Sequence, residues 1–216
     1  MRGPGPRAVP TAAPREENGG VYAFIRHGQT DWNLNDKLQG ASDIPLNDTG
    51  REQAVEAAAA LAGGPWTAIV SSPLSRARET ASIIAERLGL ELGPAYPELI
   101  ERDYGPLEGA PSSANMAAYP KRDYPDAEPL ADVVARGRAG LAKVAADYPD
   151  ADVLIVCHGT LIRYTLADLA GRTVPGILNG SVSTFSLAGD VWTVETVNGS
   201  PLEAVVDEAH QAGIAG

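Results

Sequence analysis

The chain has 216 residues, enough for a single domain with a complete hydrophobic core. Its formal net charge of −11 argues against general nucleic-acid binding and against attachment to anionic membrane surfaces. No apolar stretch approaches the roughly 18 to 20 residues that a membrane-spanning helix requires. The single cysteine, Cys157, cannot form an internal disulfide, which permits a reducing, cytoplasmic setting, and we expect it to be a small buried packing residue.

The two ends of the chain differ in composition from its middle. Residues 1–20 are rich in proline and glycine and lack the hydrophobic core of a secretory signal, so we predict a disordered N-terminal extension. One domain is expected over residues 21–200. Residues 201–216 are weakly patterned and are predicted to form a peripheral tail, which contains His210, a residue to which we assign no role.

Between these ends, strand and helix signals alternate along the chain. Apolar runs rich in β-branched residues predict strands over residues 21–25, 68–70 and 153–156. Helices are predicted from a capping box at Thr49 and Glu52, from Ser72-Pro73 to about Leu88, over residues 130–148, and from the segment after residue 158 to about residue 170. Residues 91–128 are predicted to form a long loop and residues 182–197 a closing hairpin. This alternation predicts an α/β fold, a three-layer α/β/α sandwich with a mostly parallel central sheet.

Two of the three histidines stand at matched positions, directly after predicted strands. Arg26-His27-Gly28 ends the first strand segment, and His158-Gly159 ends the segment over residues 153–156. Ligands of open α/β sheets gather at the carboxyl ends of parallel strands. One such histidine alone would more simply be a satisfied core or loop residue. Two of them, one beside an arginine, indicate a place where an anion is bound and attacked.

Four sequence blocks in a fixed order carry a resemblance to a known family. They are Arg26-His27-Gly28-Gln29-Thr30 with Asn33, residues 72–80 with Arg76, Glu101, and His158-Gly159. Together they resemble the histidine phosphatase superfamily, which includes the cofactor-dependent phosphoglycerate mutases and many small phosphatases of broad specificity. The resemblance spans residues 21–187 and implies a phosphoglycerate mutase-like fold.

The resemblance implies the central roles in phosphoryl transfer. His27 would be the nucleophile and become a phosphohistidine, because imidazole is substantially neutral near pH 7 and keeps a lone pair. Arg26 and Arg76 would clamp the phosphoryl oxygens through bidentate hydrogen bonds. By itself, Arg76 would fit a solvated helix face equally well. Arg78, about 200° around the same helix, is expected at the surface.

Other residues would complete the phosphate pocket by the same resemblance. His158 would donate a further hydrogen bond to the phosphoryl group, and Asn33 would add a neutral donor, although Asn33 alone could be a simple turn residue. Gly28 and Gly159 would permit close backbone approach. The Gln39-Gly40 stretch resembles the family loop that touches substrate.

Glu101 is the candidate proton donor. A departing alkoxide needs a proton, which a carboxylic acid supplies, and the ionised carboxylate can then activate water against the phosphohistidine. Glu108 competes for this role. We prefer Glu101 because its position before Arg102-Asp-Tyr104-Gly matches the family motif, and we expect Glu108 to be structural.

No metal ion and no other cofactor is implied. Two histidines and a glutamate could in principle hold zinc or iron. However, the close spacing typical of such ligands is missing, and neighbouring arginines would repel a cation.

The choice between phosphatase and mutase depends on the segment between Glu101 and His158. The family's mutases carry a longer insertion there with more basic residues, so the short, proline-rich segment of this chain favours a phosphatase. In contrast, residues 101–105 stay close to the mutase motif. Arg102 and Tyr104 could therefore bind a substrate carboxylate or second phosphate, the alternative for Arg102 being a solvated loop charge.

We therefore predict a phosphomonoesterase whose partner is a small phosphorylated metabolite. A cofactor-dependent phosphoglycerate mutase is the alternative. A catalytically silent phosphate-binding module is a third reading, which the presence of both histidines and Glu101 disfavours. Residues 108–129 are expected to form the lid that selects the substrate. The oligomeric state is open, with a homodimer among the options.

Overall fold

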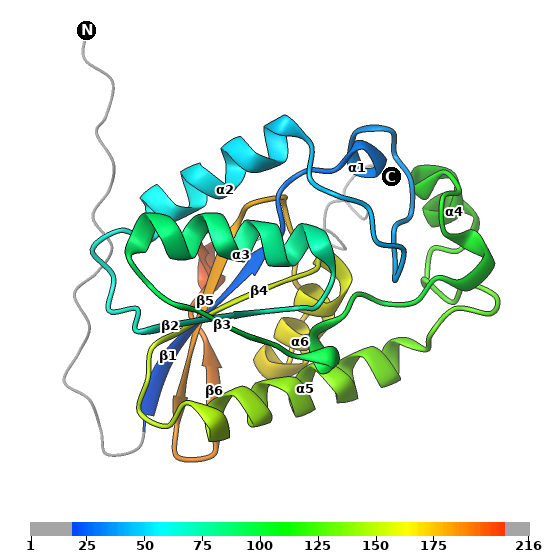
Figure 1. Ribbon diagram of the computed structural model, residues 1–216. Coiled ribbons are helices and arrows are strands. Elements are labelled where there is room, and N and C mark those ends of the chain that lie inside the picture. Colours follow the sequence, from blue (N-terminus) through cyan, green and yellow to red (C-terminus); the bar gives the residue numbers. More distant parts are fainter. Residues whose placement is uncertain (1–18, 206–216) are drawn as a thin grey trace, which may run out of the picture.

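The computed structural model describes residues 19–205 of the chain (Figure 1). Its central sheet has the strand order β3-β2-β4-β1-β5-β6. The strands are β1 (Gly19–Arg26), β2 (Ala68–Ser71), β3 (Leu92–Ala95), β4 (Val153–Cys157), β5 (Val182–Ala188) and β6 (Val191–Val194). β4 pairs in parallel with β1 and β2, and β2 with β3, whereas β5 is antiparallel to β1 and β6. The predicted α/β fold with a mostly parallel sheet is confirmed.

Helices cover both faces of this sheet. They are α1 (Asp31–Leu34), α2 (Asp48–Leu61), α3 (Ser75–Leu88), α4 (Ser112–Ala118), α5 (Leu130–Asp147) and α6 (Gly159–Ala170). In Figure 1, α2 and α3 lie on one side of the strands and α5 and α6 on the other, which gives the predicted three layers. Within the described residues, none of these helices combines the length and the apolar character needed to cross a membrane.

Alternation along β1 explains why two separate cores form. Tyr22 and Phe24 pack in the core shared with α5 and α6, whereas Ala23 and Ile25 pack in the core shared with α2 and α3. Successive side chains of a strand point to opposite faces, so a continuous apolar run fills both layers. Such runs are typical of parallel strands that are covered on both faces.

The ends of the domain lie slightly outside the predicted limits. β1 begins at Gly19, so the last residues of the predicted extension belong to the sheet. At the other end, the predicted strand over residues 191–197 is divided into β6 and β7 (Thr196–Val197). β7 pairs with β8 (Ser200–Pro201), which precedes a 3₁₀ turn, η3 (Leu202–Ala204). Residues 1–18 and 206–216, which include His210, lie outside the described part of the chain.

The predicted loop over residues 91–128 contains regular structure, so that prediction was wrong. It holds β3, the 3₁₀ turns η1 (Pro97–Leu99) and η2 (Gly105–Leu107), and α4. β3 is the edge strand, where a proline such as Pro94 is tolerated because one side of the strand needs no ladder donor. Arg78 was also predicted wrongly, since it is part-buried and its Nη1 donates to the Gly93 carbonyl at 2.6 Å.

Two helix starts differ from their predictions. α2 is capped by Asn47, whose side chain accepts a hydrogen bond from Gly50 N, and not by Thr49. α3 begins at Ser75 rather than at Ser72, and no side chain caps it. Ser72 Oγ is instead turned to the second histidine, as described below.

Candidate active site

The two strand-end histidines meet at one edge of the sheet. β1 and β4 are neighbours with Arg26 opposite Cys157, so the residue after each strand lies at the same level. The ring centroids of His27 and His158 are 5.1 Å apart. Cys157 itself is fully buried, and burial raises the pKa of its thiol well above the usual value, in agreement with a packing role.

The hydrogen bonds of His27 define its tautomer. Nδ1 lies 2.7 Å from the Gly28 carbonyl oxygen, which can only accept, so Nδ1 must carry the proton. Nε2 therefore keeps its lone pair, and it accepts a hydrogen bond from Arg76 Nε at 3.2 Å. The ring is 2% exposed. A buried imidazole with a fixed lone pair on Nε2 is suited to nucleophilic attack.

Burial keeps both imidazoles neutral. Desolvation holds the pKa of His27 well below its ordinary value of 6.5, and the positive charges of Arg26 and Arg76 lower this pKa further. The pKa of His158 is also held well below 6.5, mainly by desolvation and then by Arg76. Both rings are thus neutral at pH 7, each with one N–H and one lone pair.

The two arginines that the sequence singled out flank His27. Arg76 is fully buried, which overturns the solvated-face alternative, and its Nη1 and Nη2 donate to the carbonyls of Ser42 and Gly40 at 2.7 and 2.8 Å. Burial lowers its pKa to about 10, which still leaves it charged at pH 7. Arg26 Nη1 donates to the Ile177 carbonyl at 2.6 Å, whereas its buried Nε has no partner among the described residues.

Asn33 is oriented by a capping box. As the third residue of α1, its Oδ1 accepts from the backbone N–H of Thr30 at 3.1 Å. The same oxygen accepts from Nδ2 of Asn179 at 3.2 Å, so the Asn33 amide lines the pocket with its Oδ1 already engaged. Asn179 was missed by the sequence analysis, although it also donates to the His27 carbonyl at 3.0 Å and stands before a glycine in a turn-like segment.

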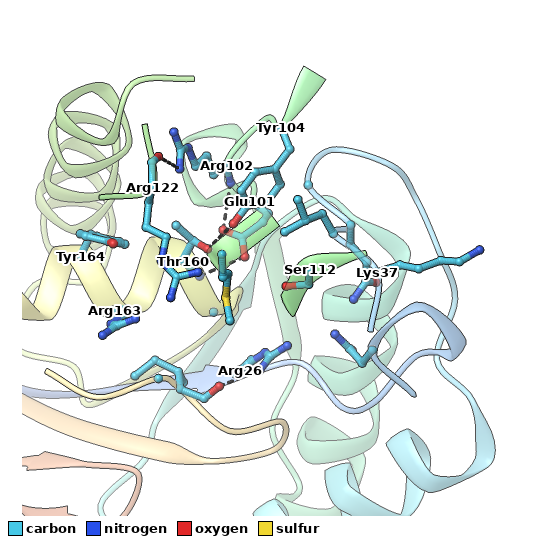
Figure 2. Close-up of a pocket in the computed structure, with 18 of the residues that line it drawn as sticks. Arg26, Lys37, Glu101, Arg102, Tyr104, Ser112, Arg122, Thr160, Arg163 and Tyr164 are labelled. Atoms are coloured by element: carbon cyan, nitrogen blue, oxygen red, sulfur yellow. Dashed lines mark hydrogen bonds between the residues drawn. The ribbon is translucent and has the colours of Figure 1, made fainter. Parts of the chain in front are cut away.

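Glu101 lies at the N-terminus of α6. Its carboxylate accepts backbone hydrogen bonds from Thr160 at 3.0 Å, Leu161 at 3.1 Å and Arg102 at 2.9 Å (Figure 2). The side chain is nearly buried and lines the same pocket as His27. Glu108, the competing candidate for the proton donor, does not line this pocket.

Glu108 holds the loop of residues 39–42 and does not line the pocket. Its carboxylate accepts from the backbone of Ala41 and Ser42 at 2.8 Å each, and the Ser42 hydroxyl also donates to it. The same loop supplies the carbonyls that Arg76 binds. Glu108 is therefore structural, as predicted. Gln39 and Gly40 line the pocket, and the φ of Gly40 is +56°, in the left-handed region that favours glycine.

Glycine is required where the His27 loop contacts α2. A Cβ on Gly28 would lie 2.1 Å from the Gly50 carbonyl oxygen, and a Cβ on Gly50 equally close to that of Gln29. The expected close backbone approach at Gly28 is thus present. Gly159 is less constrained, since its Cβ would lie 3.2 Å from Arg26 Nε.

Arg102 and Tyr104 both line the pocket, and both side chains are partly engaged by the protein itself. Arg102 is buried, and its Nε and Nη1 donate to the carbonyls of Glu128 and Arg122 at 2.7 and 2.9 Å. Its guanidinium also lies 5.4 and 5.2 Å from the ring centroids of Tyr104 and Tyr124. It is therefore not a solvated charge, and two of its three nitrogens are committed to loop carbonyls. Tyr104 is buried as well, with its hydroxyl 2.6 Å from Thr160 Oγ1.

Ser72 is a site residue that the sequence analysis placed elsewhere. Its hydroxyl lies 2.7 Å from His158 Nε2 and also accepts from the Leu74 N–H at 3.3 Å. His158 Nδ1 is buried without a hydrogen-bond partner among the described residues. If the Ser72 hydroxyl donates to Nε2, then Nδ1 carries the proton of the neutral ring. His158 is fully buried and is not among the residues that line the pocket.

The pocket above His27 is small and rich in positive charge. Its volume is about 230 Å³, which suits a small molecule rather than a polymer. Besides the residues discussed, it is lined by Lys37, Ser112, Met116, Arg122, Thr160, Arg163, Tyr164 and others. Arg122 and Arg163 were not predicted as pocket residues, because charged residues on the loop before α5 and on α6 resemble an ordinary solvated surface. Within residues 19–205, no three His, Cys, Asp or Glu side chains are grouped so that they could hold a metal ion.

The neutral histidines make the stability of the fold depend on pH. In the unfolded chain each imidazole has a pKa near 6.5, so below that pH the unfolded state binds more protons than the folded state. Stability therefore falls as the pH drops from 7.5 to 5.5, by on the order of 1 kcal/mol for each of the two residues. Urea unfolding at these two pH values measures the loss, and a His158→Asn variant should show about half of it. Equal stability at both pH values would contradict the buried neutral rings.

Comparison with known proteins agrees with this geometry. The family model of the histidine phosphatase superfamily (branch 1) matches residues 22–200. The chain is 40% identical over 182 residues to the uncharacterized phosphatase PhoE of Bacillus subtilis (strain 168), covering 82% of this chain and 94% of PhoE. The structure of a mycobacterial glucosyl-3-phosphoglycerate phosphatase complexed with VO3 superposes with a TM-score of 0.75 at 31% identity, covering 84% of this chain and 100% of that one. A phosphoglycerate mutase from Bacillus anthracis str. Sterne also gives a TM-score of 0.75, at 28% identity over 84% of this chain and 93% of its own. The chain belongs to the histidine phosphatase superfamily.

Proposed function

We propose that this protein is a metal-independent phosphatase that hydrolyses small phosphomonoesters through a phosphohistidine on His27. The observation that carries the proposal is the neutral His27 ring, with Nδ1 fixed on the Gly28 carbonyl and Nε2 next to Arg76. An unprotonated Nε2 between arginines is what attack on a phosphate dianion requires, because the cations offset the repulsion of the nucleophile.

The proposed reaction has two displacements at phosphorus. In the first, Nε2 forms a bond to phosphorus, the bond to the ester oxygen breaks, and Glu101 gives its proton to the departing alkoxide. In the second, Glu101 removes a proton from water, whose oxygen attacks phosphorus and releases His27 and inorganic phosphate. Arg26 and Arg76 hold the phosphoryl oxygens in both steps.

A phosphatase is favoured over a mutase by the short segment between Glu101 and His158. Arg102, which the mutase-like motif suggested as a second substrate ligand, lines the pocket but has its Nε and Nη1 bound to loop carbonyls. The PhoE and glucosyl-3-phosphoglycerate phosphatase relatives also support hydrolysis.

The first test is incubation with a panel of phosphorylated metabolites, including 3-phosphoglycerate, with and without EDTA. Free phosphate and product identity are both measured. We expect phosphate release that EDTA does not reduce and no isomerised product. Formation of 2-phosphoglycerate with little free phosphate would identify a mutase instead, and loss of activity in EDTA would contradict metal independence.

The role of Glu101 predicts a dependence on the leaving group. Glu101→Gln should slow hydrolysis of alkyl phosphates by about 10²-fold or more, because an alkoxide needs a proton to depart. Hydrolysis of p-nitrophenyl phosphate should fall much less, since p-nitrophenolate leaves without one. The ratio of the two rates is the readout, because partial unfolding would lower both rates equally. Asp103→Asn, at the exposed neighbouring carboxylate, is the control, and equal losses on both substrates would exclude general acid catalysis by Glu101.

A further inference from the structure

The backbone that carries Glu101 belongs to no helix or strand. Residues 101–104 run as an irregular segment between the 3₁₀ turns η1 and η2. The position of the proposed proton donor therefore depends on contacts from other elements. The carboxylate is held by the N–H groups of Thr160 and Leu161 at the start of α6. The backbone of the same segment is held by α5.

Arg136 on α5 binds this backbone. Its Nη1 donates to the carbonyls of Glu98 and Ile100 at 2.9 and 2.6 Å. Its Nη2 lies 3.4 Å from the carbonyl oxygen of Glu101 itself. One guanidinium thus contacts three carbonyls within residues 98–101. Arg136 does not line the pocket above His27, so it has no direct contact with a substrate bound there.

The guanidinium of Arg136 is oriented by an ion pair with Glu128. Oε1 and Oε2 of Glu128 accept from Nε and Nη2 of Arg136 at 3.0 and 2.9 Å, the two-bonded geometry that gives arginine–carboxylate pairs their strength and direction. Both side chains are only 20% exposed. The Glu128 carboxylate also accepts from Asp103 N at 3.2 Å, and the Glu128 N–H donates to the Asp103 carbonyl at 2.8 Å. The pair is therefore bonded to the chain on both sides of Glu101.

The helix that carries Arg136 is closely packed against its neighbours. A Cβ on Gly140 would lie 3.1 Å from the Glu98 Cβ in η1, and a Cβ on Gly137 would lie 2.1 Å from the Thr165 hydroxyl oxygen on α6. Both glycines are buried. In Figure 1, α5 and α6 run on the same side of the sheet. Arg136 thus stands on a helix that contacts both the turn before the proton donor and the helix that binds its carboxylate.

We propose that Arg136, paired with Glu128, is a positioning residue that holds the backbone of Glu101 so that its carboxyl group reaches the leaving oxygen. The proposal rests on the phosphatase function proposed above and deepens the role of Glu101 in it. The N–H groups at the start of α6 can hold the carboxylate only while the Glu101 backbone stays at the matching distance, which Arg136 sets. A general acid must lie within hydrogen-bond reach of its target, and a displacement of about 1 Å can lower a rate by about 10²-fold.

The test uses the dependence of the rate on the leaving group. Arg136→Lys keeps the charge, but a lysine ammonium cannot bind the carbonyls and Glu128 in the same planar arrangement. The substrates are p-nitrophenyl phosphate and the alkyl phosphate that the wild-type protein hydrolyses best in the metabolite panel. We expect the ratio of kcat/KM for the alkyl phosphate to that for p-nitrophenyl phosphate to fall about 10-fold or more. Partial unfolding would lower both values equally and leave the ratio unchanged.

Further variants separate positioning from a general effect on the fold. Glu128→Gln is a milder change to the same pair, and it should shift the ratio in the same direction by a smaller factor. Arg78→Lys is the matched control, because Arg78 is also part-buried and donates to a carbonyl but does not line the pocket. Its ratio should equal that of the wild type. In the Glu101→Gln background, adding Arg136→Lys should leave the ratio unchanged, because no proton donor remains to be positioned.

The outcomes divide as follows. A ratio that falls in Arg136→Lys, stays at the wild-type value in Arg78→Lys and does not fall further in the double variant with Glu101→Gln supports the proposal. A wild-type ratio in those Arg136 and Glu128 variants that fold overturns it, and so does an equal shift in Arg78→Lys or a further fall in the double variant. Each of these results leaves the phosphatase function intact. Equal losses on both substrates in Glu101→Gln alone would instead contradict the proposed general acid, and this inference with it.

Discussion

An asparagine in place of His27 is expected to lower turnover by about 10⁴-fold or more while the protein stays folded. The asparagine amide has no basic nitrogen to attack phosphorus. It can still donate a hydrogen bond toward the Gly28 carbonyl, which His27 Nδ1 contacts at 2.7 Å. The measurement is phosphate release from p-nitrophenyl phosphate, together with a circular dichroism spectrum that checks the fold.

A second histidine variant separates loss of the nucleophile from loss of any histidine. His210→Asn should retain full activity, since His210 lies outside residues 22–200, which match the family model. Quenching the wild-type protein with alkaline detergent during turnover of labelled substrate should trap a base-stable, acid-labile phosphoenzyme, which His27→Asn should not form. Residual turnover of His27→Asn within tenfold of the wild type would rule out His27 as the nucleophile.

The exchange Arg76→Lys should lower kcat/KM by about 10² to 10³-fold although it keeps the charge. The guanidinium of Arg76 joins three groups at once: His27 Nε2 and the carbonyls of Gly40 and Ser42. A lysine ammonium is a point donor and cannot reproduce this planar geometry. The steady-state kinetics of p-nitrophenyl phosphate hydrolysis measure the loss.

Arg78→Lys is the matched control for this exchange. Arg78 lies on the same helix and also donates to a carbonyl, that of Gly93 on the edge strand, but it does not line the pocket. Its replacement should lower the melting temperature and leave kcat/KM within a few-fold of the wild type. Similar kinetic losses in the two variants would mean that Arg76 acts through the stability of α3 and not through the phosphoryl group.

Much of the site could be predicted because parallel strands impose simple geometry. Apolar β-branched runs mark β1 and β4, and residues that follow neighbouring parallel strands share one edge of the sheet. The meeting of His27 and His158 follows from that rule. Their neutral state follows from burial. The place of Arg76 in the site came from the family resemblance alone, because by itself this residue fits a solvated helix face.

Other features depend on contacts that are distant in the sequence. Ser72 stands before a proline, a pattern typical of a helix cap. Its hydroxyl instead contacts His158 Nε2, and no local pattern predicts this contact because the two residues are 86 positions apart. The Arg122 carbonyl accepts a hydrogen bond from Arg102 Nη1, a contact across the loop that no local pattern predicts. β3 contains Gly93 and Pro94, which favour a loop locally, and it pairs with β2 in the sheet.

Desolvation of His27 also sets how this protein should respond to acid. Because both imidazoles resist protonation in the folded state, the nucleophile remains competent at pH values where a free histidine would be charged. In the unfolded chain both imidazoles have ordinary pKa values, so on acidification the unfolded state binds protons that the folded state does not. Acidification should therefore inactivate the protein by unfolding it before the nucleophile titrates, and ligands that occupy the phosphate pocket should extend its working range toward lower pH.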